Sequence, residues 1–358
     1  MNAKAWVVIF IMFAQAALAQ GFAGLGTDAD GYARPDPDYR FRFPADHGAH
    51  PDFRIEWWYV TATLTGADGR DYGVQWTLFR SATAPTGDTG GWDSRQIWMG
   101  HAGLTTPEAH FVEERFARGG IGQAGVVADP FDAWIDEWRL AGPDFDTLTM
   151  SAQGANFGYA LDLRASGPLV PQGVQGYSVK SAEGQASHYY SQPFYQVTGQ
   201  LTLPDGVVEV TGDAWLDREW SSQPLSENQT GWDWFSLSFK DGARLMGFRL
   251  RARESAPYTA ATWITPEGAP TPYPDGAFRA EPLNEVDVAG RQVPTRWRVT
   301  LPDRGVDVTV EALYDQSWMA TAFSYWEGPV SFGGTHQGRG YLELTGYDCP
   351  TPQPARTA

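Results

Sequence analysis

Cysteine and lysine are the residues that this sequence most clearly lacks. Cys349 is the single cysteine, and the lysines in 358 residues are Lys4, Lys180 and Lys240. One cysteine permits neither an intramolecular disulfide nor a cysteine-based metal site. Acidic residues outnumber basic ones by 43 to 26, which gives a formal charge of −17. Because such a surface repels nucleic acid and anionic lipid headgroups, we expect no nucleic-acid partner.

Familiar catalytic and cofactor-binding motifs are also missing. The sequence contains no G-x-S-x-G, no H-E-x-x-H, no P-loop and no dinucleotide fingerprint in a strand–helix context. Its six histidines offer few metal ligands. Asp46, His47 and His50 could form a metal cluster, but a polar loop whose side chains hydrogen-bond the backbone is the favoured interpretation. We therefore expect no metal and no cofactor.

Long apolar runs are absent beyond the N-terminus. Residues 5–16 form an apolar segment interrupted by Gln15, follow Lys4, and lead into the sequence A-L-A before Gln20. This pattern is typical of a secretory signal peptide cleaved near Ala19-Gln20. A membrane anchor is the alternative, but the run is too short to span a bilayer comfortably. We expect a secreted or periplasmic protein with no stable membrane span after cleavage.

Aromatic and turn-forming residues are abundant instead. The chain has 16 Trp, 40 Gly and 25 Pro, and 14% of its residues are aromatic, a composition that favours strands over helices. Several segments alternate with the two-residue period of a strand. Tyr159, Leu161 and Leu163, for example, share one face of an extended segment. These patterns predict an all-β fold.

Two of the expected hairpins resemble each other. Residues 56–80 open with an acid and two tryptophans, residues 233–250 open with an acid and two aromatics, and both turn on Asp-Gly. We interpret this pair as an internal duplication that gives two lipocalin-like antiparallel β-barrels packed together. A barrel of about eight strands can hold one small ligand. The expected organisation is a signal peptide at 1–19, a flexible leader at 20–42, an N-terminal barrel at 43–222, a C-terminal barrel at 223–350 and a disordered tail at 351–358.

The stretch of residues 211–239 is the most unusual part of the chain. It interleaves four tryptophans with acids and one arginine, although charged groups are costly to bury unless they are paired. In an extended strand, Trp215, Asp217 and Glu219 share one face and Arg218 points to the other.

Two interpretations of these charges are open. Arg218 could pair across strands with Glu56 or Asp233, in a buried salt-bridge network that ties the two domains together. Alternatively, Asp217 or Glu219 keeps a raised pKa in an aromatic cavity, where it could protonate an alkene or polarise a carbonyl group. Tryptophan faces would shape such a cavity and could stabilise a developing cation.

We therefore predict an apolar ligand site at the interface of the two barrels. Asp217 and Glu219 are the candidate catalytic residues. His101 lies in the middle of a strand and is either a satisfied core histidine or a group that faces the ligand. The candidate ligand-binding residues are Glu56, Trp57, Trp58, Tyr59, His101, Tyr190, Trp215, Arg218, Trp220, Trp232, Asp233 and Trp234.

Several motifs resemble one known family. FPADHGAHPDFRIEWWYVTATL is followed in order by GDAWLDREWSSQPL, GWDWFSLSF, LMGFRLR, YWEGPV and GYLELTGY. This series, from about Phe43 to Tyr347, resembles the AttH-like, carotenoid 1,2-hydratase-related family of secreted lipocalin-like proteins, also labelled predicted secreted hydrolases. The resemblance implies two lipocalin-like barrels, an apolar lipid or isoprenoid ligand, and ABC transporter components as partners.

The resemblance leaves two functions open. Hydratases of this family carry a histidine in a W-x-D-H-x-W arrangement, whereas this chain has Arg218 at that position, between Asp217 and Trp220. Arginine remains charged and is a poor proton donor. The first hypothesis is therefore a protein that binds an apolar ligand. The alternative is a hydratase that adds water to an isoprenoid or polyene double bond, with Asp217 or Glu219 as the acid.

Overall fold

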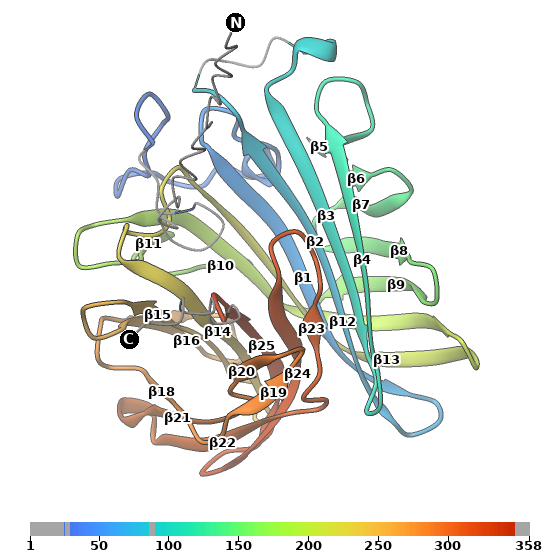
Figure 1. Ribbon diagram of the computed structural model, residues 1–358, viewed down its shortest axis with the longest axis vertical. Helices are drawn as coiled ribbons and strands as arrows, with labels where there is room; N and C mark the ends of the chain where they lie inside the picture. Colours follow the sequence, from blue (N-terminus) through green and yellow to red (C-terminus); the bar gives the residue numbers. More distant parts are fainter. Residues whose placement is uncertain (1–24, 26–28, 86–89, 348–358) are drawn as a thin grey trace, which may run out of the picture.

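The computed structural model describes Leu25, residues 29–85 and residues 90–347. The predicted signal peptide, the predicted tail and Cys349 lie outside the described residues. Within them the fold is all-β, as predicted, and no helix is long and apolar enough to cross a membrane (Figure 1). The short 3₁₀ helices of this part are η2 (Ala45–His47), η3 (Gly91–Asp93) and η4 (Pro302–Arg304).

The first sheet is antiparallel and has 13 strands in the described part of the chain. Its main path runs β4-β3-β2-β1-β13-β12-β9-β8-β7-β6-β5, and β10 and β11 pair with β12. The strands are β1 (Ile55–Gly66), β2 (Asp71–Ala82), β3 (Gln96–Thr105), β4 (His110–Arg118), β5 (Ala124–Ala128), β6 (Phe131–Ile135), β7 (Trp138–Asp144), β8 (Thr147–Gln153), β9 (Gly158–Ala165), β10 (Val170–Pro171), β11 (Tyr177–Val179), β12 (Ala186–Leu203) and β13 (Gly206–Ser221).

The second sheet has ten strands in the same described region, on the main path β17-β16-β15-β14-β25-β24-β22-β21-β18, with β23 paired to β24. A separate hairpin joins β19 (Val286–Val288) to β20 (Arg291–Val293). The strands of the second sheet are β14 (Gln229–Phe239), β15 (Arg244–Ala252), β16 (Tyr258–Ile264), β17 (Pro270–Tyr273), β18 (Arg279–Pro282), β21 (Arg296–Leu301), β22 (Val306–Ala312), β23 (Trp318–Met319), β24 (Tyr325–Gly334) and β25 (Gly338–Thr345).

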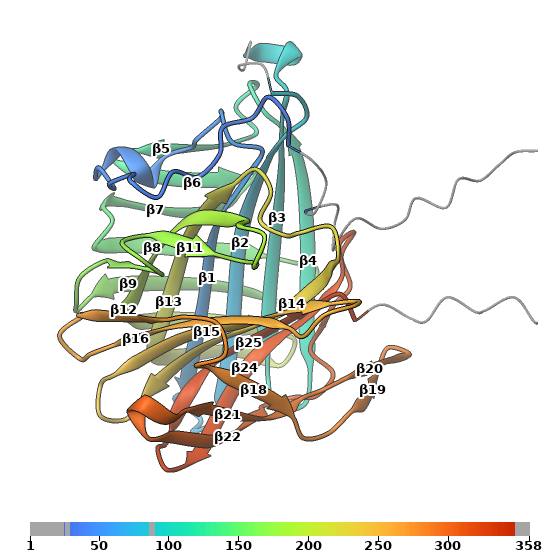
Figure 2. The same cartoon turned by 90° about the vertical axis from the view of Figure 1, so that its left-hand side faces the viewer.

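The two sheets share one strand order. In each, the first strand pairs with the second on one side and with the last on the other, so β1, β2, β13 and β12 correspond to β14, β15, β25 and β24. The hairpins predicted as a repeat are β1–β2 and β14–β15. Both sheets curl, one into a near-closed barrel and the other into a half-barrel (Figure 2).

Alternation along each strand separates an inner face from an outer face. In β1, Trp58 and Val60 belong to the buried core of the first sheet, whereas Tyr59 belongs to a different core that lies between the sheets. The second sheet has its own core around Phe235 and Trp297. Because the inner faces are filled by large side chains, the sheets meet through their outer faces.

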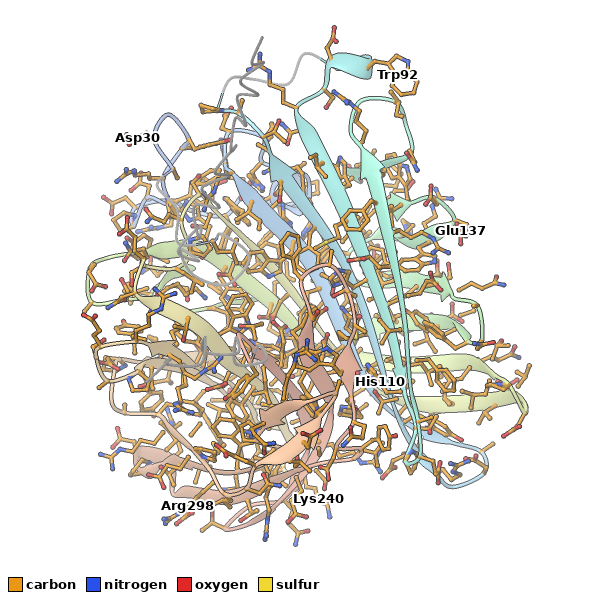
Figure 3. All side chains as sticks on the ribbon, in the orientation of Figure 1. Asp30, Trp92, His110, Glu137, Lys240 and Arg298 are labelled. Carbon is orange, nitrogen blue, oxygen red and sulfur yellow. The ribbon has the colours of Figure 1, made fainter. Side chains whose placement is uncertain are left out.

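The contact between the sheets joins β4, β12 and β13 of the first sheet to β14, β15 and β23 of the second. Trp215 of β13 meets Trp234 of β14 edge-on, with ring centroids 6.5 Å apart. The Nε of Arg244 in β15 donates to the carbonyl of Pro193 in β12 at 3.1 Å. His110, at the start of β4, also lies where the sheets meet, with its Nε2 3.3 Å from Met319 Sδ (Figure 3).

A buried acid lies in the N-terminal half of the first strand of each repeat. Glu56 forms ion pairs with Arg80 and Arg218, all three essentially without exposure. Asp233 pairs in the same way with Arg249 at 3.1 Å and with Arg251 at 3.4 Å. These networks lie within single sheets and do not tie the two sheets together.

The ion pairs offset the cost of burying these charges. Burial raises the pKa of Glu56, but Arg80 and Arg218 outweigh this effect and hold its pKa well below the usual value. The guanidinium of Arg218 also lies 3.8 Å from the ring centroid of Trp58. The sequence left Glu56 and Asp233 as alternative partners of Arg218, and the structure selects Glu56.

Part of the predicted leader packs against the first sheet. The ring of Phe41 lies 5.6 Å from that of Trp220, and the ring of Tyr39 lies 6.2 Å from it. The backbone N–H of Asp36 donates to His188 Nε2 at 3.3 Å. A flexible leader is expected through residue 42, whereas residues 36–41 are held in place by these contacts.

Candidate functional site

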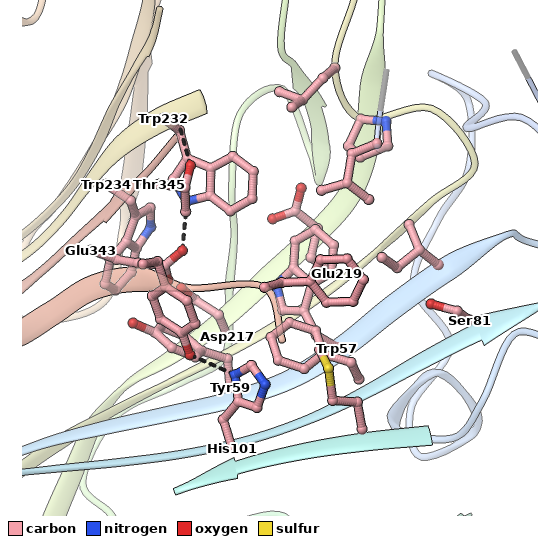
Figure 4. Close-up of a pocket in the computed structure, with 18 of the residues that line it drawn as sticks. Trp57, Tyr59, Ser81, His101, Asp217, Glu219, Trp232, Trp234, Glu343 and Thr345 are labelled. Carbon is pink, nitrogen blue, oxygen red and sulfur yellow. Dashed lines mark hydrogen bonds between the residues drawn. The ribbon is translucent and has the colours of Figure 1, made fainter. Parts of the chain in front are cut away.

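A cavity of about 410 Å³ lies between the two sheets. Its walls come from β1, β2, β3 and β13 of the first sheet and from β14, β15, β24 and β25 of the second, and most of them are apolar or aromatic (Figure 4). The side chains of Ile97, Phe116 and Phe323 line it and are themselves exposed, so they mark its mouth. Tyr59, His101, Asp217 and Glu343 gather at one side.

The cavity brings together about half of the candidate residues predicted from the sequence. Asp217 and Glu219, the candidate acids, both line it, as the alternation of β13 predicts. Trp215 lies just behind and donates its indole N–H to Asp217. The other predicted residues that line the cavity are Trp57, Tyr59, His101, Trp232 and Trp234.

The remaining candidates lie elsewhere. Trp58, Tyr190 and Trp220 belong to the core of the first sheet, and Glu56, Arg218 and Asp233 belong to the buried ion pairs. Arg218 has its side chain on the face of β13 opposite to Asp217. Arg218, which the sequence resemblance places at the position of a hydratase histidine, therefore points away from this cavity and into the first sheet.

Asp217 is fully buried and accepts three hydrogen bonds. Its donors are the hydroxyl of Tyr189 at 2.7 Å, the hydroxyl of Ser191 at 2.5 Å and the indole N–H of Trp215 at 2.6 Å. Burial disfavours the carboxylate more strongly than these donors favour it, and the pKa of Asp217 rises from 3.8 to about 7. Near neutral pH the cavity wall therefore holds a carboxyl group that can either give or take a proton.

Glu219 has a different environment. It forms an ion pair of 2.9 Å with Lys180, whose side chain is 9% exposed. The ammonium group of Lys180 also lies over the rings of Tyr189 and Phe248, at 4.8 Å and 4.4 Å from their centroids. Because Lys180 neutralises Glu219, Asp217 is the better candidate for a proton donor.

Two more acids, both in the second sheet, belong to this site: Glu327 is buried and Glu343 is half-buried. Glu343 lines the cavity, accepts the indole N–H of Trp232 at 2.7 Å, and has a pKa raised to about 7 by burial. Glu327 lies behind the wall, shares a short hydrogen bond with the Tyr59 hydroxyl, and has its pKa raised well above the usual value by burial and by Glu343.

The candidate residues predicted from the sequence did not include these two acids. Both stand in motifs that carry the family resemblance, YWEGPV and GYLELTGY, as single acids between apolar strand residues. An isolated acid in an otherwise apolar strand is the signal that could have found them, because burial of a lone carboxyl group requires a partner or a proton.

His101 is buried and bonded at both ring nitrogens. Its Nδ1 lies 2.9 Å from the Tyr325 hydroxyl and its Nε2 lies 3.1 Å from Glu114 Oε1. Burial lowers the pKa of His101, despite the opposing effect of Glu114. His101 lines the cavity, and both of its ring nitrogens have hydrogen-bonding partners. It is therefore both a core histidine with its hydrogen bonds made and a group that faces the cavity, the two interpretations that the sequence left open.

The loop candidates for a metal site have other partners. His47 stacks on Phe145 with ring centroids 3.8 Å apart, and His50 stacks on Trp220 at 3.9 Å. Asp46 accepts hydrogen bonds from the Tyr39 hydroxyl and from the backbone of Arg42. Across the described residues, no group of three or more His, Cys, Asp or Glu side chains could hold a metal ion.

Solved structures share this architecture. An AttH protein from Nitrosomonas europaea superposes with a TM-score of 0.79 at 32% identity, covering 88% of this chain and 99% of that chain. Kievitone hydratase from Nectria haematococca superposes with a TM-score of 0.62 at 14% identity, covering 87% of this chain and 97% of that chain, and shares the fold.

The sequence comparisons agree with the structural ones. No curated protein sequence matches this chain. A family model described as AttH-like matches residues 34–347, which confirms the resemblance drawn from the sequence motifs. By this match and by its likeness to the Nitrosomonas protein, the chain belongs to the AttH-like family.

Proposed function

We propose that this protein binds an apolar molecule of lipid or isoprenoid type in the cavity between its two sheets. The cavity itself carries the proposal: about 410 Å³ of space with aromatic and aliphatic walls and a few polar groups at one side. Ligand sites generally have this size and this combination of apolar walls with few polar groups. The mouth at Ile97, Phe116 and Phe323 gives an apolar ligand a route in.

The cellular location of the protein and its partner are also part of the proposal. The N-terminal sequence pattern supports export to the periplasm or beyond after cleavage near Ala19-Gln20. The family resemblance supports ABC transporter components as partners, to which the ligand would be delivered. A soluble carrier suits such a role, because an apolar molecule needs a covered site to cross water.

Binding is tested with cis-parinaric acid, a polyene fatty acid whose fluorescence rises in apolar sites. The purified chain should enhance this fluorescence and show saturation, and Trp57→Ala should weaken the affinity because Trp57 lines the cavity. Trp92→Ala is the matched control, since Trp92 is 74% exposed and lies outside the cavity. No saturable enhancement, together with no lipid extracted from protein expressed in its own host, would reject the proposal.

A second candidate function is acid-catalysed hydration of a carbon–carbon double bond. The observation that favours it is Asp217, a cavity-lining carboxyl group with a pKa of about 7. In this reaction the acid gives a proton to one carbon, and water adds to the cation on the other carbon and then releases a proton. The net change is the addition of one water molecule, and the tryptophan faces of the cavity can stabilise the cation.

Hydration is tested with an acyclic carotenoid in detergent. Mass spectrometry should detect a product heavier by one water, and Asp217→Asn should abolish it. Asp162→Asn, on the exposed face of β9, is the control and should leave the product unchanged. Equal turnover by both variants would remove Asp217 from the mechanism, whereas no turnover by the native chain would favour the binding role.

A further inference from the structure

The inner end of the cavity carries more acid than base. Asp217 and Glu219 of β13 and Glu343 of β25 all line it, and Lys180 is the base beside them. Lys180 is already paired with Glu219 at 2.9 Å. Within the described part of the chain, no basic side chain forms an ion pair with Asp217 or Glu343. Two acids of the cavity wall therefore have no positively charged partner.

These acids lie away from the mouth of the cavity. Ile97 of the mouth is on β3, and β2 and β1 separate that strand from β13, which carries Asp217. Neighbouring strands lie about 4.8 Å apart, so β13 is about 14 Å from β3 across the sheet. Arg54, the other base of the wall, directly precedes Ile55, which is level with Ile97 in the register of β1, β2 and β3. A molecule that enters at the mouth therefore meets the acids with its leading end.

Aromatic rings accompany the acids at this end. Glu343 accepts the indole N–H of Trp232 at 2.7 Å, and Tyr59 lies at the same side of the cavity (Figure 4). Trp57, Trp232 and Glu343 line the cavity and are only half-buried, so each keeps surface that a bound molecule can cover. The faces of tryptophan and tyrosine rings attract cations, and groups of such rings bind ammonium compounds. A carboxylate beside these rings adds the opposite charge.

Lys180 shows how this cavity holds an ammonium group. Its Nζ contacts Glu219 and lies 4.8 Å and 4.4 Å from the ring centroids of Tyr189 and Phe248. The hydroxyl of Tyr189 also donates to Asp217 at 2.7 Å, so the ring that receives Lys180 borders an acid without a basic partner. One acid of the wall is thus neutralised by an ammonium group of the protein itself, in contact with aromatic rings.

We propose that the inner end of the cavity binds an ammonium group, so that the ligand is an amphiphile with a positively charged head and an apolar tail. The head lies between Asp217 and Glu343, and the tail extends to the mouth at Ile97, Phe116 and Phe323. This choice of ligand rests on the proposed function, because it specifies which kind of apolar molecule the cavity takes. A carboxylate head is disfavoured, since it would meet three acids and a single lysine.

Three compounds with the same ten-carbon tail test this preference: decylamine, decanol and decanoate. Isothermal titration calorimetry compares their binding to the full chain at pH 8. At this pH the amine is protonated, and Asp217 and Glu343, whose pKa values are about 7, are largely ionised. Decylammonium should bind about tenfold more tightly than decanol, and decanoate should bind most weakly.

Two variants of the cavity wall locate the effect. Glu343→Gln and Asp217→Asn each remove one charge and should each weaken decylammonium binding about tenfold. Their affinity for decanol should stay close to that of the native chain, which shows that the cavity is intact. Glu281→Gln is the matched control, because it removes the same charge from an exposed position on β18, and it should change neither affinity.

The outcomes separate this proposal from the binding function. Tighter binding of decylammonium that is lost only in the two cavity variants supports the ammonium site. Equal affinities for decylammonium and decanol would overturn the site but leave the binding of apolar molecules in place. An equal loss in Glu281→Gln would also overturn it, because the preference would then come from the net charge of −17. No binding of any of the three compounds would count against both proposals.

Discussion

The proton of Asp217 should make the stability of this protein depend on pH. The group is fully buried, and its pKa in the folded chain is about 7 against 3.8 ordinarily. Below pH 4 the carboxyl group is protonated in both the folded and the unfolded chain. As the pH rises, the unfolded chain loses this proton first, so the free energy of unfolding falls until the folded chain also loses it near pH 7.

The size of this effect follows from the pKa difference. At 1.36 kcal/mol for each pH unit, a rise from 3.8 to about 7 corresponds to roughly 4 kcal/mol of lost stability above pH 7. Asp217→Asn removes this titration but keeps the shape of the side chain, and its amide oxygen can still accept from Ser191 and Trp215. The variant should therefore gain about 4 kcal/mol relative to the native chain between pH 4 and pH 8.

Urea unfolding followed by tryptophan fluorescence at several pH values measures this difference. Subtracting native from variant values at each pH cancels the acids that do not interact with Asp217. Glu343, whose pKa is raised in part by Asp217, contributes a residual difference. Asp162→Asn serves again as the exposed control and should show a difference that does not change with pH. A flat difference for Asp217→Asn, within about 1 kcal/mol, would mean that the three hydrogen bonds to Asp217 keep it ionised and that it is no proton donor at neutral pH.

Two further predictions concern stability and the contact between the sheets. Glu56→Gln leaves Arg80 and Arg218 buried without their counter-charge and should lower the free energy of unfolding by about 3–5 kcal/mol at pH 7, as measured by urea unfolding. Because the pKa of Glu56 is depressed in the folded chain, the native protein should lose the same contribution as the pH falls below 4.5, the ordinary pKa of this group. A cost below about 1 kcal/mol would contradict this reasoning. Gly73→Val places a side chain where the Pro329 ring now lies, so it should push the two sheets apart. We expect a loss of about 1–3 kcal/mol in the free energy of unfolding and weaker binding of parinaric acid. Unchanged stability and affinity would show that this contact does not hold the cavity closed.

Much of the fold could be predicted from the sequence because strands leave a local signal. Alternation placed Asp217 and Glu219 on one face of β13 and Arg218 on the other, and the structure has them so. The repeat of acid, aromatics and Asp-Gly turn predicted two related hairpins, which are β1–β2 and β14–β15.

The composition of the cavity was harder to predict, because it depends on which outer faces meet. Alternation shows that Trp57 and Trp58 point in opposite directions, but it does not show which of them faces a second sheet. Trp57 lines the cavity and Trp58 fills the core of the first sheet. Glu327 and Glu343 reach the site from strands near the C-terminus, far in sequence from residues 211–239, and only packing of the sheets brings them there.

The shared strand order has a consequence for the origin of the site. Strands β1 and β2 of one repeat correspond to β14 and β15, and β13 and β12 correspond to β25 and β24. Across the contact β1 meets β25 as β13 meets β14, and β2 meets β24 as β12 meets β15, which is the reciprocal pattern of a two-fold symmetric homodimer. In the register of the first sheet Glu219 lies opposite Trp57, and in the register of the second sheet Glu343 lies opposite Trp234. Both halves therefore carry an acid at the same position. A dimeric ancestor would have carried two identical half-sites. Fusion of such a dimer into one chain would free the halves to diverge, and the carboxyl group of Asp217 stands where the other half has the phenol of Tyr341.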